Sequence, residues 1–283
     1  MAGRAKIGVF DSGVGGLTVL RALIERIPGA DYLYFGDTAR LPYGSKSAAT
    51  VAHYAVGAVR YLQDEGAELL VIACNTATAL ALDEIKAAAS LEVIGVVEPG
   101  AEAAAAASRK REVVVIGTEA TVSSHAYRRA LEARAVAVRE KACPLFVPLV
   151  EEGWVEHPVT EQVARIYLSE AFSGDGDFGA DVLVLGCTHY PLIKPLLRRV
   201  APEHVMIVDS AESTAQAVAH QLQIKAQAES VPGSTKSARV DSYIGEIPKL
   251  TFFATDSAEK FKRMGTRFLG LPVENVLHAD LKE

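Results

Sequence analysis

Two cysteines occupy matching positions along the chain. Cys74 follows an apolar run at residues 70–73, and Cys187 follows a similar run at residues 183–186. A polar residue and the start of a predicted helix come after each cysteine, and the positive end of a helix favours a thiolate. A thiol has a reference pKa of about 8.5, so either sulfur can exchange protons near neutral pH. A buried structural role explains one such cysteine, but the repeated pattern favours chemistry for both.

Two thiols on opposed halves of a molecule suit the inversion of a carbon stereocentre. A thiolate removes a proton from one face of the carbon while a thiol delivers a proton to the other face, and the roles exchange in the reverse direction. The chain has only one further cysteine, Cys143, so a disulfide framework is not expected. A dithiol oxidoreductase using Cys74 and Cys187 is an alternative, against which the lack of a C-x-x-C motif counts.

A glycine-rich turn at residues 10–17 contains Asp11 and Ser12. Such turns often aim backbone N–H groups at an anion. The spacing is not G-x-G-x-x-G, and a phosphate there would meet the charge of Asp11, so a dinucleotide site is not predicted. Asp11 could orient Cys74, or Asp11 or Ser12 could simply cap the following helix.

His189 lies two residues after Cys187 and could orient that thiol. A histidine at a strand end is otherwise often a structural residue with its hydrogen bonds satisfied. The two side chains supply two candidate metal ligands, but no C-x-x-C or H-x-x-x-H motif completes a site, so no metal is expected.

The segment at residues 38–44 follows the second predicted strand. Pro42 and Gly44 would fix a tight loop, and Tyr43 with the adjacent backbone could contact a ligand. Arg40 is a candidate partner for a carboxylate. An ordinary connection between a strand and a helix is the alternative explanation of this segment.

Short apolar runs alternate with longer helical patterns. The runs, rich in Val, Ile and Leu, lie at residues 7–10, 32–35, 69–73, 93–97, 113–117, 182–185, 205–208 and 250–253. Their lack of polar alternation is typical of strands buried on both faces. Clear helical patterns lie between them at residues 17–27, 48–65 and 78–89. This alternation predicts an α/β protein with largely parallel sheets.

The similarity of the two cysteine segments favours two open sheets over one barrel. We predict two similar domains, each a mainly parallel sheet with helices on both faces, with the active site between them. Pro99 and Gly100 are the expected crossing into the second domain, and Asp209 and Ser210 the return. Residues 225–245 are rich in Ser, Gly and Pro and predict an exposed loop. The expected domains are residues 1–98 with 210–283, and residues 99–209.

The overall composition narrows the class of protein. The chain has 283 residues, of which 49% are hydrophobic and 23% charged, ordinary values for a globular enzyme. A net charge of −6 does not favour a nucleic-acid partner. No apolar run approaches the roughly 20 residues that cross a bilayer, and the N-terminus enters a predicted strand without room for a signal peptide. We therefore expect a cytoplasmic protein without a membrane partner.

With these motifs assembled, the sequence resembles the glutamate racemases of the aspartate/glutamate racemase superfamily over nearly its whole length. The motifs are Phe-Asp-Ser-Gly-Val-Gly-Gly-Leu from Phe10, Leu-Pro-Tyr-Gly from Leu41, Ala-Cys-Asn-Thr-Ala from Ala73, Gly-Thr-Glu-Ala-Thr from Gly117 and Gly-Cys-Thr-His-Tyr-Pro-Leu from Gly186. Each motif alone is weak, but together they are specific. The last one is closer to the glutamate branch than to the aspartate branch.

The resemblance implies that Cys74 and Cys187 are the proton acceptor and donor, supported by Asp11, Glu152 and His189. It implies substrate contacts from Asp11, Ser12, Pro42, Tyr43, Gly44, Asn75, Thr76, Thr118, Thr121, Thr188 and His189. It also implies glutamate as the substrate, no cofactor, a homodimer, and a cytoplasmic enzyme that supplies D-glutamate for bacterial peptidoglycan.

Two alternatives besides the dithiol oxidoreductase stay open at this point. A racemase for aspartate or another amino acid would use the same two thiols, and a panel of substrates separates these activities. A small-molecule binding module also suits two α/β lobes, and it would bind glutamate without turnover. The expected lack of a signal peptide counts against a periplasmic module.

Overall fold

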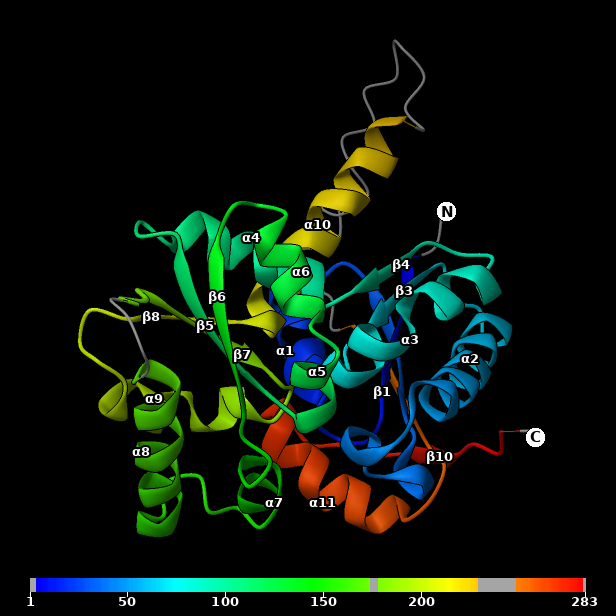
Figure 1. Cartoon of the computed structure of the whole chain (residues 1–283). Coiled ribbons are helices and arrows are strands. Elements are labelled where there is room, and N and C mark those ends of the chain that lie inside the picture. The colour runs from blue at the N-terminus through cyan, green and yellow to red at the C-terminus, as the bar shows by residue number, and fades with distance from the viewer. Residues whose placement is uncertain (1–3, 174–177, 229–247, 282–283) are drawn as a thin grey trace.

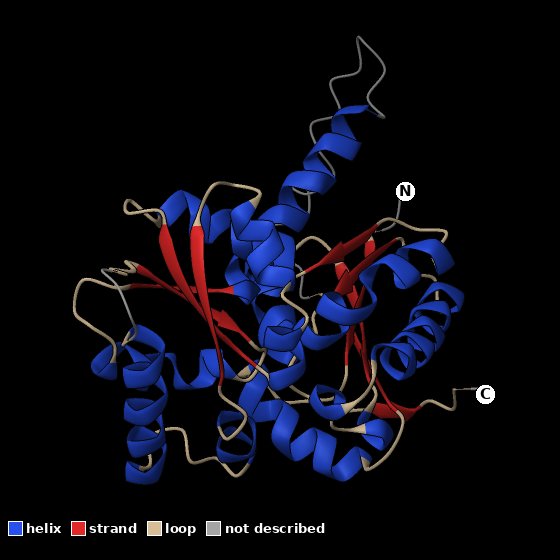
Figure 2. Cartoon of the chain, in the orientation of Figure 1, coloured by secondary structure: helices blue, strands red, loops and turns tan. Residues whose placement is uncertain are grey.

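Two parallel sheets surrounded by helices form the protein (Figures 1 and 2). The structure is a computed structural model that describes residues 4–173, 178–228 and 248–281. The first sheet has the order β10 (Val276–His278), β9 (Leu250–Ala254), β2 (Asp31–Gly36), β1 (Lys6–Asp11), β3 (Leu69–Ile72) and β4 (Val93–Gly95). The second has the order β6 (Ala137–Ala142), β5 (Glu112–Gly117), β7 (Val182–Gly186) and β8 (Met206–Asp209). The predicted fold class is confirmed.

The three helices that the sequence predicted clearly are present as α1 (Leu17–Arg26), α2 (Ala48–Asp64) and α3 (Asn75–Ala88). The third begins three residues earlier than expected because the side chain of Cys74 caps it, accepting a hydrogen bond from the N–H of Ala77. The expected strands are also all present. Two others, β6 and β10, were not predicted.

The remaining helical segments complete both domains. They are 3₁₀ turns η1 (Thr38–Arg40), η2 (Tyr43–Ser45) and η3 (Tyr190–Ile193), and helices α4 (Val97–Ala107), α5 (Glu119–Ser123), α6 (Ala126–Glu132), α7 (Phe146–Glu151), α8 (Pro158–Phe172), α9 (Lys194–Val200), α10 (Ser210–Ala228) and α11 (Ala258–Leu269). None of the helices in the described ranges is long and apolar enough to cross a membrane.

The structure differs from two sequence predictions about the connections between elements. Pro99 and Gly100, the expected crossing between domains, lie inside α4, whereas the expected return falls where β8 ends and α10 begins. The exposed loop expected at residues 225–245 is wrong for residues 225–228, which continue α10. The rest of that segment, residues 229–245, lies outside the described residues.

Alternate side chains of the first sheet pack on opposite faces, as the period of a strand requires. Val9 and Val71 belong to one buried cluster, which also contains the apolar side chains of α1. Phe10 and Ile72 belong to another, which contains those of α2 and α3. Helices therefore cover both faces of the sheet. Because β1 and β3 are packed on both faces, their carboxyl ends are held in place at the edge of the sheet.

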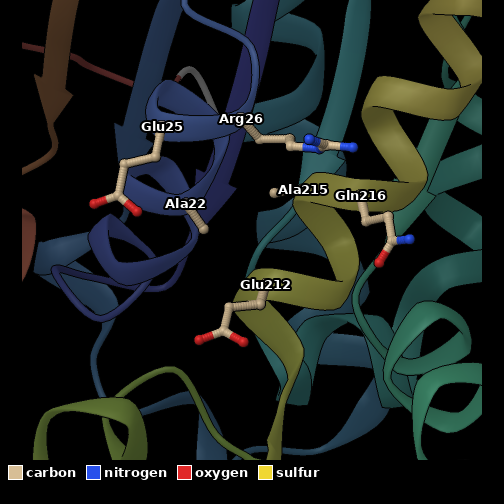
Figure 3. Close-up of a pocket in the computed structure, with 6 residues that line it drawn as sticks. All are labelled: Ala22, Glu25, Arg26, Glu212, Ala215 and Gln216. Carbon is tan, nitrogen blue, oxygen red and sulfur yellow. The ribbon is translucent and has the colours of Figure 1, made fainter.

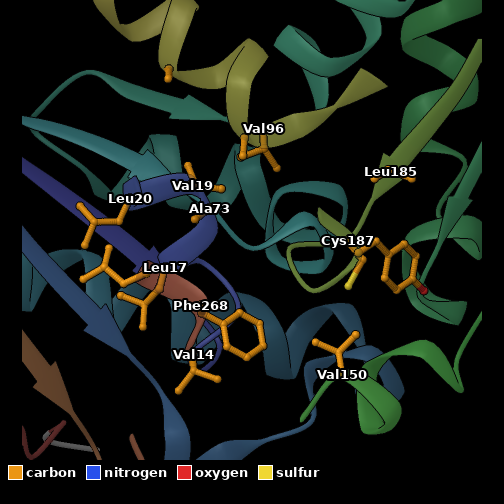
Figure 4. Close-up of a cluster of buried hydrophobic side chains, with 14 of the residues drawn as sticks. Val14, Leu17, Val19, Leu20, Ala73, Val96, Val150, Leu185, Cys187 and Phe268 are labelled. Carbon is orange, nitrogen blue, oxygen red and sulfur yellow. The ribbon is translucent and has the colours of Figure 1, made fainter. Parts of the chain in front are cut away.

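The cluster beside α1 continues into the second sheet, and we call it the shared core. It contains Leu17 and Leu20 of α1 together with Leu185 of β7 and Phe268 of α11 (Figure 4). Fully burying a side chain of this size stabilises a protein by about 1.5–3 kcal/mol. Because residues of both sheets share these contacts, the two domains are packed against each other through apolar side chains.

Candidate active site

The two predicted thiols lie in equivalent places in the two sheets. Cys74 follows β3, whose neighbour β1 ends at Asp11. Cys187 follows β7, whose neighbour β5 is followed by Thr118. Each thiol residue is 5% exposed. The carboxyl ends of parallel strands are where open α/β sheets bind ligands, so both cysteines occupy positions suited to chemistry.

Cys74 is held at the N-terminus of α3. Its Sγ accepts a hydrogen bond from the N–H of Ala77 at 3.4 Å and donates one to Oγ of Ser12 at 3.5 Å. Burial, and then the nearby charge of Asp11, raise the pKa of the Cys74 thiol to about 12, against the opposing hydrogen bonds. Cys74 is therefore a protonated thiol at neutral pH, which makes it a proton donor.

Asp11 is a buried carboxyl group with one oxygen free. Its Oδ2 accepts a hydrogen bond from the N–H of Gly13 at 2.8 Å, whereas its buried Oδ1 has no partner among the described residues. Burial raises the pKa of Asp11, although the N–H of Gly13 and the charge of His189 act in the other direction. A buried acceptor without a partner is costly, and a ligand with an N–H group would satisfy it.

Cys187 belongs to a chain of three polar side chains. Its Sγ lies 3.9 Å from Nδ1 of His189, and Nε2 of the same ring lies 3.1 Å from Oε1 of Glu151. Burial alone lowers the pKa of His189, but the hydrogen bonds with Cys187 and Glu151 outweigh it and raise the pKa to about 10. His189 is therefore an imidazolium at neutral pH, and a neighbouring imidazolium stabilises a thiolate.

The carboxylate in this chain is Glu151, whereas the resemblance had indicated Glu152. Burial acts to raise the pKa of Glu151, but the hydrogen bond with His189 and the positive charge of His189 outweigh burial. The pKa of Glu151 is therefore lowered, and this side chain is ionised. Glu152 is exposed at the end of α7. The two residues are adjacent in the sequence, and only the turn of α7 decides which of them reaches the imidazole.

Phe268 packs against the imidazole of His189. Its ring lies 5.1 Å from the ring of His189, in a T-shaped arrangement with an interplanar angle of 79°. Figure 4 shows Phe268 and Val150 near Cys187 in the shared core. The ring of Phe268 therefore lies beside the imidazole that bridges Cys187 and Glu151.

One glycine-rich turn contacts the surroundings of both thiols. Ser12 touches Cys74, and three residues later Gly15 lies against the second domain. A Cβ atom at Gly15 would come within 2.3 Å of Oγ1 of Thr188 and 2.6 Å of the ring of His189, so only glycine fits there. The turn therefore brings the neighbourhoods of Cys74 and Cys187 to one place.

Three threonines that the sequence predicted as ligand contacts form a cluster of hydroxyl groups. Oγ1 of Thr76 lies 3.0 Å from Oγ1 of Thr118 and 3.4 Å from Oγ1 of Thr121, and the latter two are 2.9 Å apart. Thr76 belongs to α3, next to the first sheet, and the other two follow β5 of the second. The cluster supplies neutral donors at the carboxyl edges of both sheets.

The side chain of Asn75 is already bonded on both sides. Its Oδ1 accepts a hydrogen bond from the hydroxyl of Tyr127 at 2.7 Å, and its Nδ2 donates to Oγ of Ser210 at 3.3 Å. All three residues are buried. Tyr127 is an aromatic residue without a motif and was not predicted from the sequence, and Ser210 was predicted only as a domain boundary.

The loop at residues 38–44 also places its predicted residues beside the second domain. Pro42 precedes η2, and the hydroxyl of Tyr43 donates to Asp37 at 2.7 Å. A Cβ atom at Gly44 would contact Thr118 at 3.4 Å, so this segment borders the threonine cluster. Arg40, the candidate carboxylate partner, is instead paired with Asp37 at 2.9 Å.

One surface hollow lies away from these groups, and a smaller cavity borders them. A hollow of about 370 Å³ between α1 and α10 is lined by Ala22, Glu25, Arg26, Glu212, Ala215 and Gln216 (Figure 3), which include neither a thiol nor an imidazole. A smaller cavity of about 70 Å³ touches Glu151, Val14 and Leu41 and so borders the polar chain of Cys187. Within the described residues, no group of three His, Cys, Asp or Glu side chains is arranged to hold a metal ion.

The sequence and the fold of this chain are similar to those of known proteins. The family model described as Asp/Glu/Hydantoin racemase matches residues 7–218. A glutamate racemase of Koribacter versatilis (strain Ellin345) is 60% identical over 286 residues, covering 98% of each chain. The solved structure of glutamate racemase isoform RacE1 from Bacillus anthracis has a TM-score of 0.86 at 35% identity and covers 99% of each chain. The solved structure of glutamate racemase from Francisella tularensis subsp. tularensis SCHU S4 in complex with D-glutamate has a TM-score of 0.83 at 32% identity and covers 98% of each chain.

These matches span nearly the whole chain and both sheets, and the chain therefore belongs to the Asp/Glu/Hydantoin racemase family. It is a racemase, an enzyme of the isomerase class. The relatives that match it at high identity are glutamate racemases.

Proposed function

We propose that this racemase interconverts L- and D-glutamate, with Cys74 and Cys187 as its two acid/base groups. The main support for this proposal is the pair of thiols at matching strand ends. One glycine-rich turn lies next to both of them, because Ser12 contacts Cys74 and Gly15 lies against Thr188. The glutamate racemases among the relatives support glutamate as the substrate, and one of their structures holds D-glutamate.

The surroundings of the two thiols support different roles for them in one direction of the reaction. Cys187 acts as a base beside the imidazolium of His189, and Cys74, buried beside Asp11, acts as the thiol that delivers a proton. In one direction the Cys187 thiolate removes the α-proton, and the Cys74 thiol delivers its own proton to the opposite face of the carbon. The product leaves with Cys187 as thiol and Cys74 as thiolate, the state that accepts the other enantiomer.

The other predicted contacts stabilise the substrate and its carbanion. Oδ1 of Asp11, which lacks a partner in the protein, accepts a hydrogen bond from the substrate ammonium group. The hydroxyls of Ser12, Thr76, Thr118, Thr121 and Thr188 donate to carboxylate oxygens as negative charge develops. Asn75 acts mainly by holding the start of α3, because its amide is bonded to Tyr127 and Ser210.

The first test follows the circular dichroism of L-glutamate incubated with the purified protein in heavy water without added cofactor. We expect the signal to decay to zero while deuterium enters the α-carbon. A stable signal with glutamate and decay with aspartate would move the assignment to aspartate. Tight binding of glutamate without any decay would favour a binding module, and thiol-dependent electron transfer would favour an oxidoreductase.

Several broader parts of the proposal rest on the resemblance to the family. We propose domains of residues 1–98 with 210–283 and residues 99–209, which follow the membership of the two sheets. We also propose a cytoplasmic homodimer that supplies D-glutamate for peptidoglycan. Light scattering on the purified protein tests the dimer, and the D-glutamate requirement of a deletion strain tests the cellular role.

A further inference from the structure

Asp37 is a charged residue at the candidate site that the sequence motifs do not include. It follows β2 at the carboxyl edge of the first sheet, and its N–H donates to the carbonyl of Asp11 at 3.1 Å. Its side chain is 0% exposed. A buried carboxylate must be paired and hydrogen-bonded to be tolerated, so its partners indicate what it holds in place.

Three side chains from three segments donate to this one carboxylate. Arg40 and Thr255 donate to Oδ1 at 2.9 and 2.8 Å, and Tyr43 donates to Oδ2 at 2.7 Å. Thr255 also accepts a hydrogen bond from the N–H of Ala39 at 2.9 Å. Asp37 therefore ties η1, η2 and the end of β9 together.

Both oxygens of the Asp37 carboxylate are engaged by side-chain donors. The guanidinium of Arg40 neutralises it and lies 4.9 Å from the ring of Tyr54, which fixes its orientation. Burial, together with the neighbouring carboxylate, raises the pKa of Tyr43, so its hydroxyl stays protonated and keeps donating to Asp37. These properties suit a group that orients others and does not react.

The segment that Asp37 holds reaches the second domain. Tyr43 is anchored through its hydroxyl, and the next residue, Gly44, faces Thr118, because a Cβ atom added at Gly44 would lie 3.4 Å from Cβ of Thr118. Thr118 in turn bonds with Thr76 and Thr121. The position of the backbone at residues 43–44 relative to the threonine cluster therefore depends on the hydrogen bond between Tyr43 and Asp37.

We propose that Asp37 is a positioning residue that sets the affinity for substrate by fixing the Tyr43–Gly44 backbone against Thr118. This inference rests on the proposed glutamate racemisation and on the predicted contacts of Tyr43 and Gly44 with a substrate carboxylate. The hydroxyl of Tyr43 is used by Asp37, so the substrate would meet the backbone of this segment and the edge of the tyrosine ring.

The test compares Tyr43→Phe, Thr255→Val and Asp37→Asn with matched controls. Tyr32→Phe is the control for Tyr43→Phe, because it removes a buried tyrosine hydroxyl of β2 that donates to the carbonyls of Leu23 and Ile27. Thr160→Val is the control for Thr255→Val, because it removes a threonine hydroxyl that donates to the carbonyl of Trp154. We expect Tyr43→Phe to raise KM by about tenfold, as the loss of one hydrogen bond to a charged group predicts, with kcat nearly unchanged.

The pH profile of kcat provides a second readout, because a positioning role leaves the thiols and His189 unaltered. We expect Tyr43→Phe and Asp37→Asn to raise KM with an unchanged profile, and their double variant to be no worse than the stronger single one. The proposal is overturned if Tyr43→Phe behaves like Tyr32→Phe, or if it lowers kcat at constant KM. A wild-type protein inactive on glutamate would instead remove the proposed function. If Asp37→Asn does not fold, Tyr43→Phe alone decides.

Discussion

Nε2 of His189 and Oε1 of Glu151 lie 3.1 Å apart, although the two residues belong to different segments separated by 38 positions. The carboxylate keeps the imidazole protonated and turned toward Cys187. We expect Glu151→Gln to lower kcat by about tenfold to a hundredfold, the range for the loss of a hydrogen bond between charged groups. Steady-state polarimetry in both directions measures this loss.

Glu152→Gln is the matched control, because it makes the same chemical change one residue along on an exposed side chain. We expect its activity to stay within about twofold of the wild type, as is usual for a surface substitution. Loss of activity in Glu152→Gln, with Glu151→Gln unaffected, would reverse the assignment.

The raised pKa of His189 predicts how stability changes with pH. Its folded pKa is about 10, against 6.5 for an unperturbed histidine, so the folded state holds this proton more tightly. The stabilisation is fully present below pH 6.5 and is lost as pH rises towards 10. We expect the melting temperature to fall across this window, and to fall less steeply in His189→Asn. Equal slopes in the two proteins would contradict the raised pKa.

Replacing each thiol tests the two-base mechanism directly. Cys74→Ser and Cys187→Ser should each lower racemisation by about 10²- to 10⁴-fold, the usual contribution of a general acid or base. Cys143→Ser should retain activity, because that buried sulfur bonds only to the carbonyl of Lys141 in the described structure. Full racemisation by either of the first two variants would exclude the mechanism.

Isotope effects in the same variants assign each thiol to one enantiomer. Enantiomers have an equilibrium constant of one, so kcat/KM must be equal in the two directions and cannot distinguish the bases. With α-deuterated substrates, removal of the deuteron becomes more rate-limiting for the enantiomer that meets the altered residue. We expect Cys74→Ser and Cys187→Ser to show their larger primary isotope effects with opposite enantiomers. The same enantiomer in both would indicate one shared base.

Gly15→Ala tests the contact between the glycine-rich turn and the second domain. The added methyl group would lie 2.3 Å from Oγ1 of Thr188 and must displace it or the His189 ring, so we expect kcat to fall by about tenfold or more. Gly57→Ala is the control, because this residue lies in α2 and its added Cβ would meet only the side chain of Leu281, at 3.8 Å. That variant should be fully active and slightly more stable. Equal activity in both variants would argue against a role for this contact.

The sequence predicted those elements whose burial leaves a strong apolar pattern. Strands such as β3 and β7 are buried throughout and were found from their Val, Ile and Leu content. Strand β6 was missed because Ala137–Ala142 lies at a sheet edge and has three consecutive charged residues, Arg139 to Lys141, in place of an apolar run. Strand β10 was missed because three residues are too short to show a period.

The same limit applied to the candidate site. Motifs in the sequence contain Cys74, Cys187 and His189. The choice between Glu151 and Glu152 depends on the rotation of α7, which two adjacent identical residues do not reveal. Asp37 has no motif, since its role arises from partners as distant in sequence as Thr255. Contacts between remote segments are set by tertiary packing, which local patterns do not encode.

The shared core makes the two domains one thermodynamic unit. Leu20 beside the first sheet and Leu185 in the second belong to the same cluster, so unfolding either domain would expose apolar surface on the other. Heat should therefore melt the protein in a single calorimetric transition, with equal van't Hoff and calorimetric enthalpies. The second domain cut out alone would expose a large apolar face and aggregate, so neither half of this enzyme persists without the other.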